Sequence, residues 1–181
     1  MKIFIPLAEG FEELEAIAVI DILRRAGLAV TTAALTSEKL VLGAHGVLIQ
    51  ADAVLDELDL GGFDAVILPG GGLGTENLLK DPRITGIVQG FNAEGKYVCA
   101  ICAAPTVLAA AGVLAGLKGT CYPTCAVALG ESYGNVPVIA DGNIITSQGP
   151  GTALLFGLVL AHHFAGEETA RKVAKAMLTT Y

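Results

Sequence analysis

Short apolar runs and stretches of helical spacing alternate along the chain. The apolar runs, which have the length of buried strands, cover residues 3–8, 28–35, 63–68 and 97–101. Apolar positions recur with helical spacing in residues 11–26, 75–92 and 103–114. Because the strands alternate with helices and are mostly apolar, the pattern predicts an α/β fold, a mostly parallel sheet with helices on both faces.

Two hairpins, one further strand and two C-terminal helices complete the predicted elements. Residues 40–49 have β-like segments, and Asp141-Gly142-Asn143 separates two strands within residues 136–146, which is a strong hairpin signal. Residues 120–126 are predicted to form a strand. Residues 147–152 form a loop, and the two helices follow it.

The junction after strand 97–101 carries a cysteine. Cys102 stands between this strand and the next helix, with small residues around it at Ala100, Ala103 and Ala104. This is the pattern of a nucleophile elbow, with Cys where hydrolases carry Ser. Small neighbours let the backbone turn sharply and expose the side chain, and the following helix N-terminus favours a thiolate. Cys102 is therefore the predicted nucleophile.

The other three cysteines give no strong indication of a chemical role. Cys99 lies inside the strand, where a cysteine is usually a small buried hydrophobe. Cys99 and Cys102 have the spacing of a redox pair, but in such pairs both cysteines stand at a helix start. With Cys121 and Cys125 the spacing resembles a zinc pattern, yet no glycine-rich polar knuckle surrounds either pair. No metal is expected.

A glutamate in the first helix is the second candidate. Glu15 lies within an apolar stripe of the helical wheel, whereas Glu13 points to the far side. The apolar residues on the face of Glu15 are Ala18, Val19 and Ile22. Burial raises a carboxyl pKa, and a protonated Glu15 would donate a hydrogen bond to a thiolate. The alternative is a glutamate favoured by the helix dipole, like Glu12 and Glu13.

The glycines that follow strand 63–68 have two interpretations. Gly70-Gly71-Gly72-Leu73-Gly74 meets neither the dinucleotide nor the Walker spacing, so nucleotide binding is not expected. One interpretation is a set of exposed backbone N–H groups beside the elbow, suited to an oxyanion. The other is a plain strand-to-helix turn. The pattern leaves both open.

Composition and charge narrow the class of protein. Of the 181 residues 53% are hydrophobic, which favours one tightly packed domain over residues 1–181. The net charge is −7 with no basic patch, so nucleic acid is not an expected partner. The longest apolar stretch, residues 153–161, is too short to span a bilayer. Without a signal peptide or a disulfide framework, a cytoplasmic protein is expected.

Several motifs occur in the order of a known family and cover essentially the whole chain. They are Gly10 to Glu15, Asp21 to Gly27, Leu68 to Gly71, Ala100 to Pro105 and Thr146 to Thr152. Together they resemble the ThiJ/PfpI superfamily, in its DJ-one (parkinsonism-associated deglycase) branch. The resemblance implies a flavodoxin-like three-layer sandwich, a homodimer and no cofactor.

The resemblance also implies roles. It maps the oxidation-sensitive nucleophile to Cys102, its protonated carboxyl partner to Glu15, and the oxyanion amides to Gly71 and Ala103. It implies glyoxalase or deglycase action on methylglyoxal-like α-oxoaldehydes or their early protein adducts. The alternative is an oxidative-stress sensor or redox-regulated chaperone that acts through oxidation of Cys102 without significant turnover.

Three departures from the family pattern qualify these roles. The protease-like branch has a histidine directly after its nucleophile, but Ala103 stands here, so proteolysis is disfavoured. Relatives with a histidine near the active cysteine carry it before a proline, where this chain has Tyr122 before Pro123. His45 replaces an arginine that some relatives lend across the dimer, so it is expected to approach Cys102 of a second copy. The predicted neighbours of the site are Gly72, Tyr122, His45 and Pro150.

Overall fold

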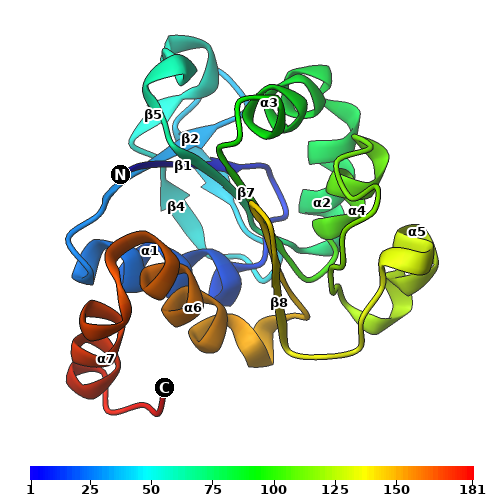
Figure 1. Ribbon diagram of the computed structural model, residues 1–181. Coiled ribbons are helices and arrows are strands. Elements are labelled where there is room, and N and C mark those ends of the chain that lie inside the picture. Colours follow the sequence, from blue (N-terminus) through cyan, green and yellow to red (C-terminus); the bar gives the residue numbers. More distant parts are fainter.

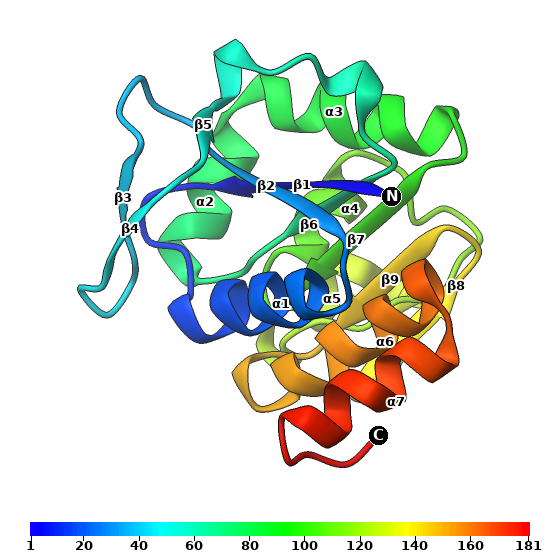
Figure 2. The same ribbon diagram turned by 90° about the vertical axis from the view of Figure 1, so that its left-hand side faces the viewer.

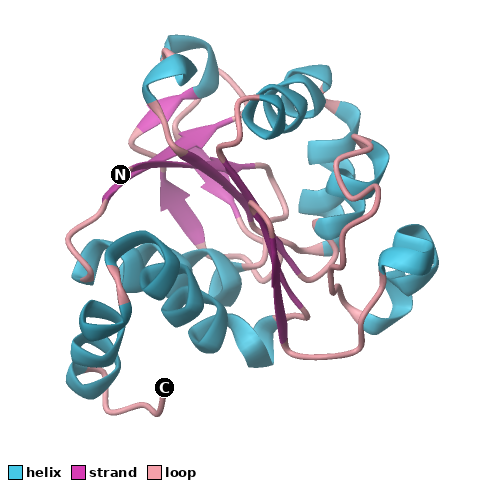
Figure 3. Ribbon diagram, in the orientation of Figure 1, coloured by secondary structure: helices cyan, strands magenta, loops and turns pink.

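A seven-stranded sheet forms the centre of the computed structural model, which describes residues 1–181 (Figures 1 and 3). Its strands are β1 (Lys2–Leu7), β2 (Ala29–Ala34), β5 (Ala53–Val54), β6 (Ala65–Leu68), β7 (Tyr97–Ile101), β8 (Val138–Asp141) and β9 (Ile144–Ser147). Their order is β5-β2-β1-β6-β7-β9-β8, and every neighbouring pair is parallel except β8–β9. The sheet confirms the predicted mostly parallel α/β fold.

Helices cover both faces of the sheet and make the sandwich three-layered. One layer consists of α1 (Glu13–Arg25), α6 (Ala153–Ala165) and α7 (Glu167–Ala176), and the other of α2 (Gly72–Lys80), α3 (Pro82–Ala93) and α4 (Pro105–Ala110) (Figure 1). Each layer encloses its own core, with Phe156 buried in the first and Leu78 in the second. No helix is both long enough and apolar enough to cross a membrane.

Two predicted helices differ from the observed ones. The single helix predicted over residues 75–92 is two helices, because Asp81 caps α3 by accepting from the Arg83 amide and Pro82 has no amide to continue α2. The helix predicted over residues 103–114 is only α4, since the chain still turns before Pro105 and Gly112 ends the next turn with a φ of 76°.

The strand predicted over residues 120–126 is wrong. Pro123–Cys125 form a 3₁₀ turn that leads into the short helix α5 (Ala126–Leu129), and the Thr120 amide donates to the Thr146 side chain at 2.8 Å. Residues 144–147 of β9 already occupy the place beside β7, so this segment has no strand to pair with.

Both predicted hairpins are confirmed, and one short strand was not predicted. Residues 40–49 correspond to β3 (Leu40–Leu42) and β4 (Leu48–Gln50), which pair in a separate antiparallel ribbon. β8 and β9 form the second hairpin at the sheet edge. The two-residue strand β5 is too short to give a periodic signal, and only its pairing with β2 defines it.

Candidate active site

Cys102 occupies a strained elbow at the carboxyl end of β7. Its φ of 65° lies in the left-handed region, which a non-glycine residue rarely adopts and which commonly marks a functional site. Two backbone hydrogen bonds hold it there, since the Cys102 amide donates to the Ser147 carbonyl at 2.9 Å and its carbonyl accepts from the Tyr122 amide at 2.7 Å. The residue is 9% exposed. The structure thus confirms the predicted elbow.

Glu15 lies fully buried behind the cysteine. Its Oε2 accepts from the Gly70 amide at 2.9 Å, its Oε1 has no hydrogen-bond partner, and the nearby Cys102 thiol influences its pKa. The void beside it is too small for a water molecule. The residues that line this void are Ile5, Ala16, Val19, Ile67, Pro69 and Ile101. No water therefore fits between Glu15 and the residues around it, and the Cys102 thiol is the titratable group beside it.

Burial and mutual repulsion shape the ionisation of this pair. Burial raises the pKa of Glu15 to about 7, although hydrogen bonds from Cys102 and Gly70 oppose it. Burial, reinforced by the charge of Glu15, also raises the pKa of Cys102 to about 12. The pair thus loses one proton near neutral pH and retains the other. Movement of the retained proton from sulfur to Glu15 gives a thiolate beside a carboxylic acid.

The start of α4 contributes less to a thiolate than the sequence pattern suggested. α4 begins only at Pro105, three residues beyond the sulfur-bearing residue, and it is six residues long. The amides of Gly71 and Ala103 do lower the pKa of Cys102, but burial and the Glu15 charge outweigh them. This arrangement can form a thiolate by transfer of the thiol proton to the Glu15 carboxylate.

The glycine turn after β6 is a strand-to-helix turn, and it lies against the Cys102–Glu15 pair. Gly71 caps α2 with a φ of 92°, as a strand-to-helix turn requires. A Cβ on Gly70 would lie 2.5 Å from Glu15 Oε2 and 2.7 Å from Cys102 Cβ. Only glycine lets the turn approach the pair this closely. The amides of Gly71 and Ala103 both lower the pKa of the Cys102 thiol, because an N–H group near the sulfur favours its anionic form.

The rim of the site is formed by the loop after β9 and the segment before α5. The half-exposed Tyr122 ring faces Gly149, the residue before Pro150, and Gly149 also faces the Cys102 sulfur. Pro150 starts a 3₁₀ turn, and Gly72 is the first residue of α2. Gly149 itself was missed, because nothing in the motif Gly149-Pro150-Gly151 distinguishes its first glycine from its second.

Glu13 was predicted to point to the side of α1 opposite Glu15, and the structure shows that this side is buried too. The hairpin β3–β4 lies beside the start of α1 (Figure 2). The Glu13 carboxylate accepts from the His45 amide at 2.7 Å, the His45 ring Nδ1 at 2.9 Å and the Val47 amide at 3.4 Å. Gly43 leaves room for this carboxylate, because a Cβ there would overlap it. A helical wheel cannot show a hairpin from another part of the chain.

The same hydrogen bonds set the charge of Glu13 and the position of His45. Burial alone would raise the Glu13 pKa, but the donors from His45 and Val47 prevail and lower it to about 2. The Glu13 carboxylate in turn raises the pKa of His45. His45 remains largely exposed, and within one chain it contacts Glu13 rather than Cys102.

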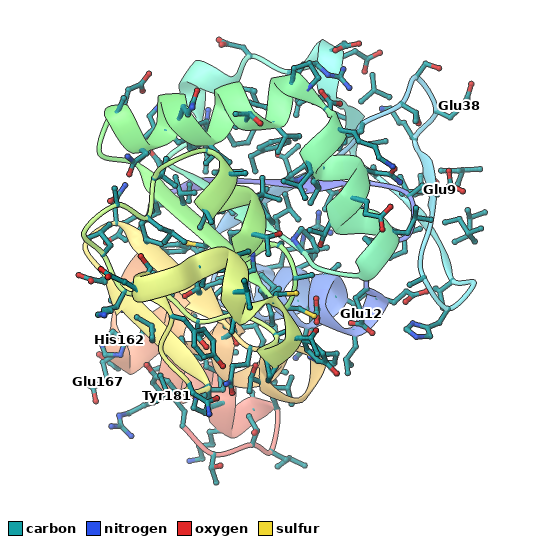
Figure 4. All side chains as sticks on the ribbon, turned by 90° about the vertical axis from the view of Figure 1, so that its right-hand side faces the viewer. Glu9, Glu12, Glu38, His162, Glu167 and Tyr181 are labelled. Carbon is teal, nitrogen blue, oxygen red and sulfur yellow. The ribbon has the colours of Figure 1, made fainter.

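Glu12, Glu13 and His45 are the one group whose side chains are arranged as metal ligands, with their ligand atoms within 4.8 Å of one another. Their hydrogen bonds already account for this arrangement. Glu12, labelled at the start of α1 in Figure 4, accepts from the Glu15 amide at 2.7 Å, and Glu13 accepts from the hairpin. The four cysteines do not converge, since Cys99 and Cys102 belong to one core layer and Cys121 to the other.

Comparison with known proteins identifies the family. The profile of the DJ-1/PfpI family matches residues 1–163. The chain belongs to the DJ-1/PfpI family. Its fold is the flavodoxin-like sandwich of that family, since the structure of oxidised Toxoplasma gondii DJ-1 matches with a TM-score of 0.96 at 34% identity over 99% of both chains.

Two curated members of the DJ-1/PfpI family illustrate the relationship. Protein dj-1beta of Drosophila melanogaster is 42% identical over 97% of this chain and 95% of its own length. Deglycase TK1284 of Thermococcus kodakarensis is 35% identical over 83% of this chain and 92% of its own length. The resemblance inferred from the sequence motifs is thus confirmed for the family.

Proposed function

We propose that this protein is a cysteine-dependent, cofactor-independent enzyme that acts on methylglyoxal-like α-oxoaldehydes or on their early protein adducts. The observation that carries the proposal is the sulfur of Cys102, held between a buried, proton-exchanging Glu15 and the amides of Gly71 and Ala103. Catalysis of nucleophilic addition to an aldehyde requires a nucleophile, a proton donor and an oxyanion site. The name of the Thermococcus relative supports a deglycase-type reaction.

The geometry assigns each group a step. The Cys102 sulfur adds to the aldehyde carbon, the C=O π electrons move to oxygen, and a proton reaches that oxygen from Glu15. The amides of Gly71 and Ala103 stabilise the charge that develops on the oxygen. Glu15 then moves a proton from the former aldehyde carbon to the neighbouring carbon through an enediol. Water hydrolyses the resulting thioester, so methylglyoxal plus water gives lactate and the free thiol.

A direct assay tests the proposal. Methylglyoxal consumption and lactate formation are measured for the wild type, for Cys102→Ser and for Cys125→Ser, which alters a partly exposed thiol outside this site. We expect turnover by the wild type and by Cys125→Ser and none by Cys102→Ser. Equal rates for the wild type and Cys102→Ser would sink the proposal.

A second candidate function is redox sensing by Cys102. Stepwise oxidation by peroxide adds two oxygens and gives a sulfinate, which the Gly71 and Ala103 amides and a protonated Glu15 would stabilise. The neighbour from Toxoplasma gondii is described as oxidised, which supports such chemistry within the family. Mild peroxide followed by intact mass tests it. Oxygen addition that Cys102→Ser abolishes, without aldehyde turnover, favours the sensor over the enzyme, and no addition contradicts it.

We also propose that the protein works as a homodimer. Exposed apolar side chains gather where α1 meets the hairpin, and a surface of this kind favours association. They are Leu14, Ile17, Leu40, Leu42, Val47 and Leu48. Light scattering measures the mass in solution. We expect a dimer that Leu48→Glu converts to a monomer, whereas a monomeric wild type contradicts the proposal.

A further inference from the structure

Thr146 is a polar residue in a fully buried part of the sheet. It lies in β9, opposite Ala100 of β7 and Ile139 of β8, and no part of it is exposed. A hydroxyl in such a place costs free energy unless it forms a hydrogen bond. The Thr146 Oγ1 accepts from the Thr120 amide at 2.8 Å, so the buried hydroxyl has a backbone partner from another segment.

The Thr120 amide needs this partner because its segment is not a strand. Both edges of β9 are paired, one with β7 and the other with β8, so residues 119–122 form no ladder with it. The segment nevertheless lies close to β9, since a Cβ on Gly119 would lie 3.3 Å from Thr146 Oγ1. Thr120 is fully buried, and without the Thr146 hydroxyl its amide would lose its partner. The hydroxyl therefore takes the place that a strand carbonyl has in a sheet.

Two further hydrogen bonds join the same two segments to Cys102. Two residues after Thr120, the Tyr122 amide donates to the Cys102 carbonyl at 2.7 Å. One residue after Thr146, the Ser147 carbonyl accepts from the Cys102 amide at 2.9 Å. These three hydrogen bonds and the backbone between them form a closed ring, the elbow ring. Its members are residues 120–122, 102 and 146–147.

The elbow ring explains how the strained conformation of Cys102 persists. A φ of 65° is unfavourable for a residue with a side chain, and it is kept only where the surroundings fix the backbone on both sides. The end of β9 holds the Cys102 amide, and residues 120–122 hold its carbonyl. The hydrogen bond between Thr146 and Thr120 joins these two segments to each other. Its loss would let them separate and the elbow relax.

We propose that Thr146 is a positioning residue, whose hydroxyl closes the elbow ring and thereby holds the Cys102 thiol beside Glu15. The inference rests on the proposed role of Cys102 as the reactive residue, which the enzyme and the sensor share. Thr146 acts through the backbone of residues 120–122 and not by contact with a substrate.

The pH profile of Cys102 alkylation tests the proposal. Thr146→Val keeps the shape of the side chain and removes the acceptor, so the thiol should move away from Glu15. Its reaction with iodoacetamide, measured by mass spectrometry of the Cys102 peptide, should have a midpoint near the ordinary thiol pKa of about 8.5 and be about tenfold slower at pH 7 than in the wild type. Thr146→Ser keeps the hydroxyl and should restore the wild-type midpoint. A wild-type profile in Thr146→Val overturns the proposal.

Thr120→Val is the matched control. The Thr120 hydroxyl is buried and has no hydrogen-bond partner, so its removal leaves the Thr120 amide and the elbow ring in place. We expect the alkylation rate and the midpoint of the wild type. A change in Thr120→Val as large as that in Thr146→Val would show that any substitution in this part of the core disturbs Cys102, and it overturns the proposal.

Amide hydrogen exchange of the wild type covers the case in which Thr146→Val does not fold. If the elbow ring holds Cys102, the amides of Thr120, Tyr122 and Cys102 become free together. Their exchange rates, corrected for intrinsic rates, should then agree within about tenfold. A Thr120 amide that exchanges more than about tenfold faster than the Cys102 amide overturns the proposal, because Cys102 would then stay held while the ring is open.

Neither measurement uses an aldehyde. A wild type that consumes no methylglyoxal therefore contradicts the proposed enzyme, while the alkylation profile and the exchange rates still decide the role of Thr146.

Discussion

Glu13 and Glu15 stand two residues apart in the first turn of α1, are both buried, and titrate in opposite directions. The pKa of Glu13 is lowered to about 2, whereas that of Glu15 is raised to about 7. The donors explain the difference. Glu13 accepts from two backbone amides and an imidazole, while Glu15 accepts from one amide and faces a thiol. Burial raises the pKa of both carboxylates, and only Glu13 has enough donors to outweigh it.

The two carboxylates in the first turn of α1 therefore have different roles. Glu13 is fixed as an anion and fastens the hairpin β3–β4 to α1. Glu15 has a pKa near neutrality and a single polar neighbour beyond Gly70, so it can gain and lose a proton as Cys102 reacts. A group that must transfer protons needs an environment that favours neither form strongly.

The largest expected effect is a difference in aldehyde turnover between variants of Glu15 and of Glu13. Glu15→Gln removes the exchangeable proton, so aldehyde turnover should fall about 100-fold or more. Glu13→Gln, the matched control on the same helix turn, should stay within about threefold of the wild type because its carboxylate faces the hairpin. Steady-state kinetics measures both. Similar losses in the two variants would contradict the division of roles.

The pH dependence of thiol reactivity sharpens the same contrast. The Cys102–Glu15 pair loses its first proton near the Glu15 pKa of about 7. Alkylation of Cys102 in the wild type should therefore increase through pH 7, and Glu15→Gln should lose this midpoint. Stopped-time alkylation between pH 5 and pH 10 measures it, at values chosen to bracket the ordinary carboxyl and thiol pKa ranges. A midpoint near 7 in Glu15→Gln would exclude the carboxyl as its source.

The Glu15→Gln substitution should lower the activity but raise the free energy of unfolding above pH 7. The Glu15 pKa is 4.5 ordinarily and about 7 in the fold, so the folded chain retains a proton that the unfolded chain loses, and stability falls as pH rises from 4.5 to 7. Above pH 7 Glu15→Gln should thus be more stable than the wild type by up to about 3 kcal/mol. Urea unfolding at pH 8 and pH 4 measures this gain, which should vanish at the lower pH.

Gly43→Ala should damage the hairpin without touching the reactive pair. The new Cβ overlaps the Glu13 carboxylate, so the fold should lose about 2 kcal/mol through overpacking. Gly46→Ala is a poor control because of its positive φ, whereas Gly86→Ala in α3 meets open space. Thermal unfolding measures the difference between Gly43→Ala and Gly86→Ala. Equal stability of these two variants would show that Glu13 moves aside at no cost.

Glu13→Gln should give the smallest change in stability, and its sign is opposite to that of Glu15→Gln. The lowered Glu13 pKa stabilises the fold above the ordinary value of 4.5, and this contribution is lost as pH falls toward 2. At pH 7 the variant should therefore lose about 1–2 kcal/mol. Unfolding at pH 7 and at pH 3 tests it, since the deficit should shrink at the lower pH. A Glu13→Gln variant that is more stable than the wild type at pH 7 would contradict this contrast between Glu13 and Glu15.

The sequence determined the features that depend on nearby residues. Alternating apolar runs and helical stretches specified the α/β sandwich, because element periodicity is a local property. The small residues around Cys102 specified the elbow, and the wheel position of Glu15 specified its burial. Pro82 also marked the break between α2 and α3, although the helical spacing on either side of it concealed the break.

Tertiary structure alone decided the features that join distant segments. Glu13 is buried by a hairpin about 30 residues away, as its contact with His45 at a separation of 32 shows. Residues 120–126 form no strand because β9 takes the place beside β7. Gly149 meets Cys102 and Tyr122 only where three loops converge. A local sequence pattern shows which side chains are chemically reactive. Their protonation states and contacts depend on residues that are brought close only when the chain folds.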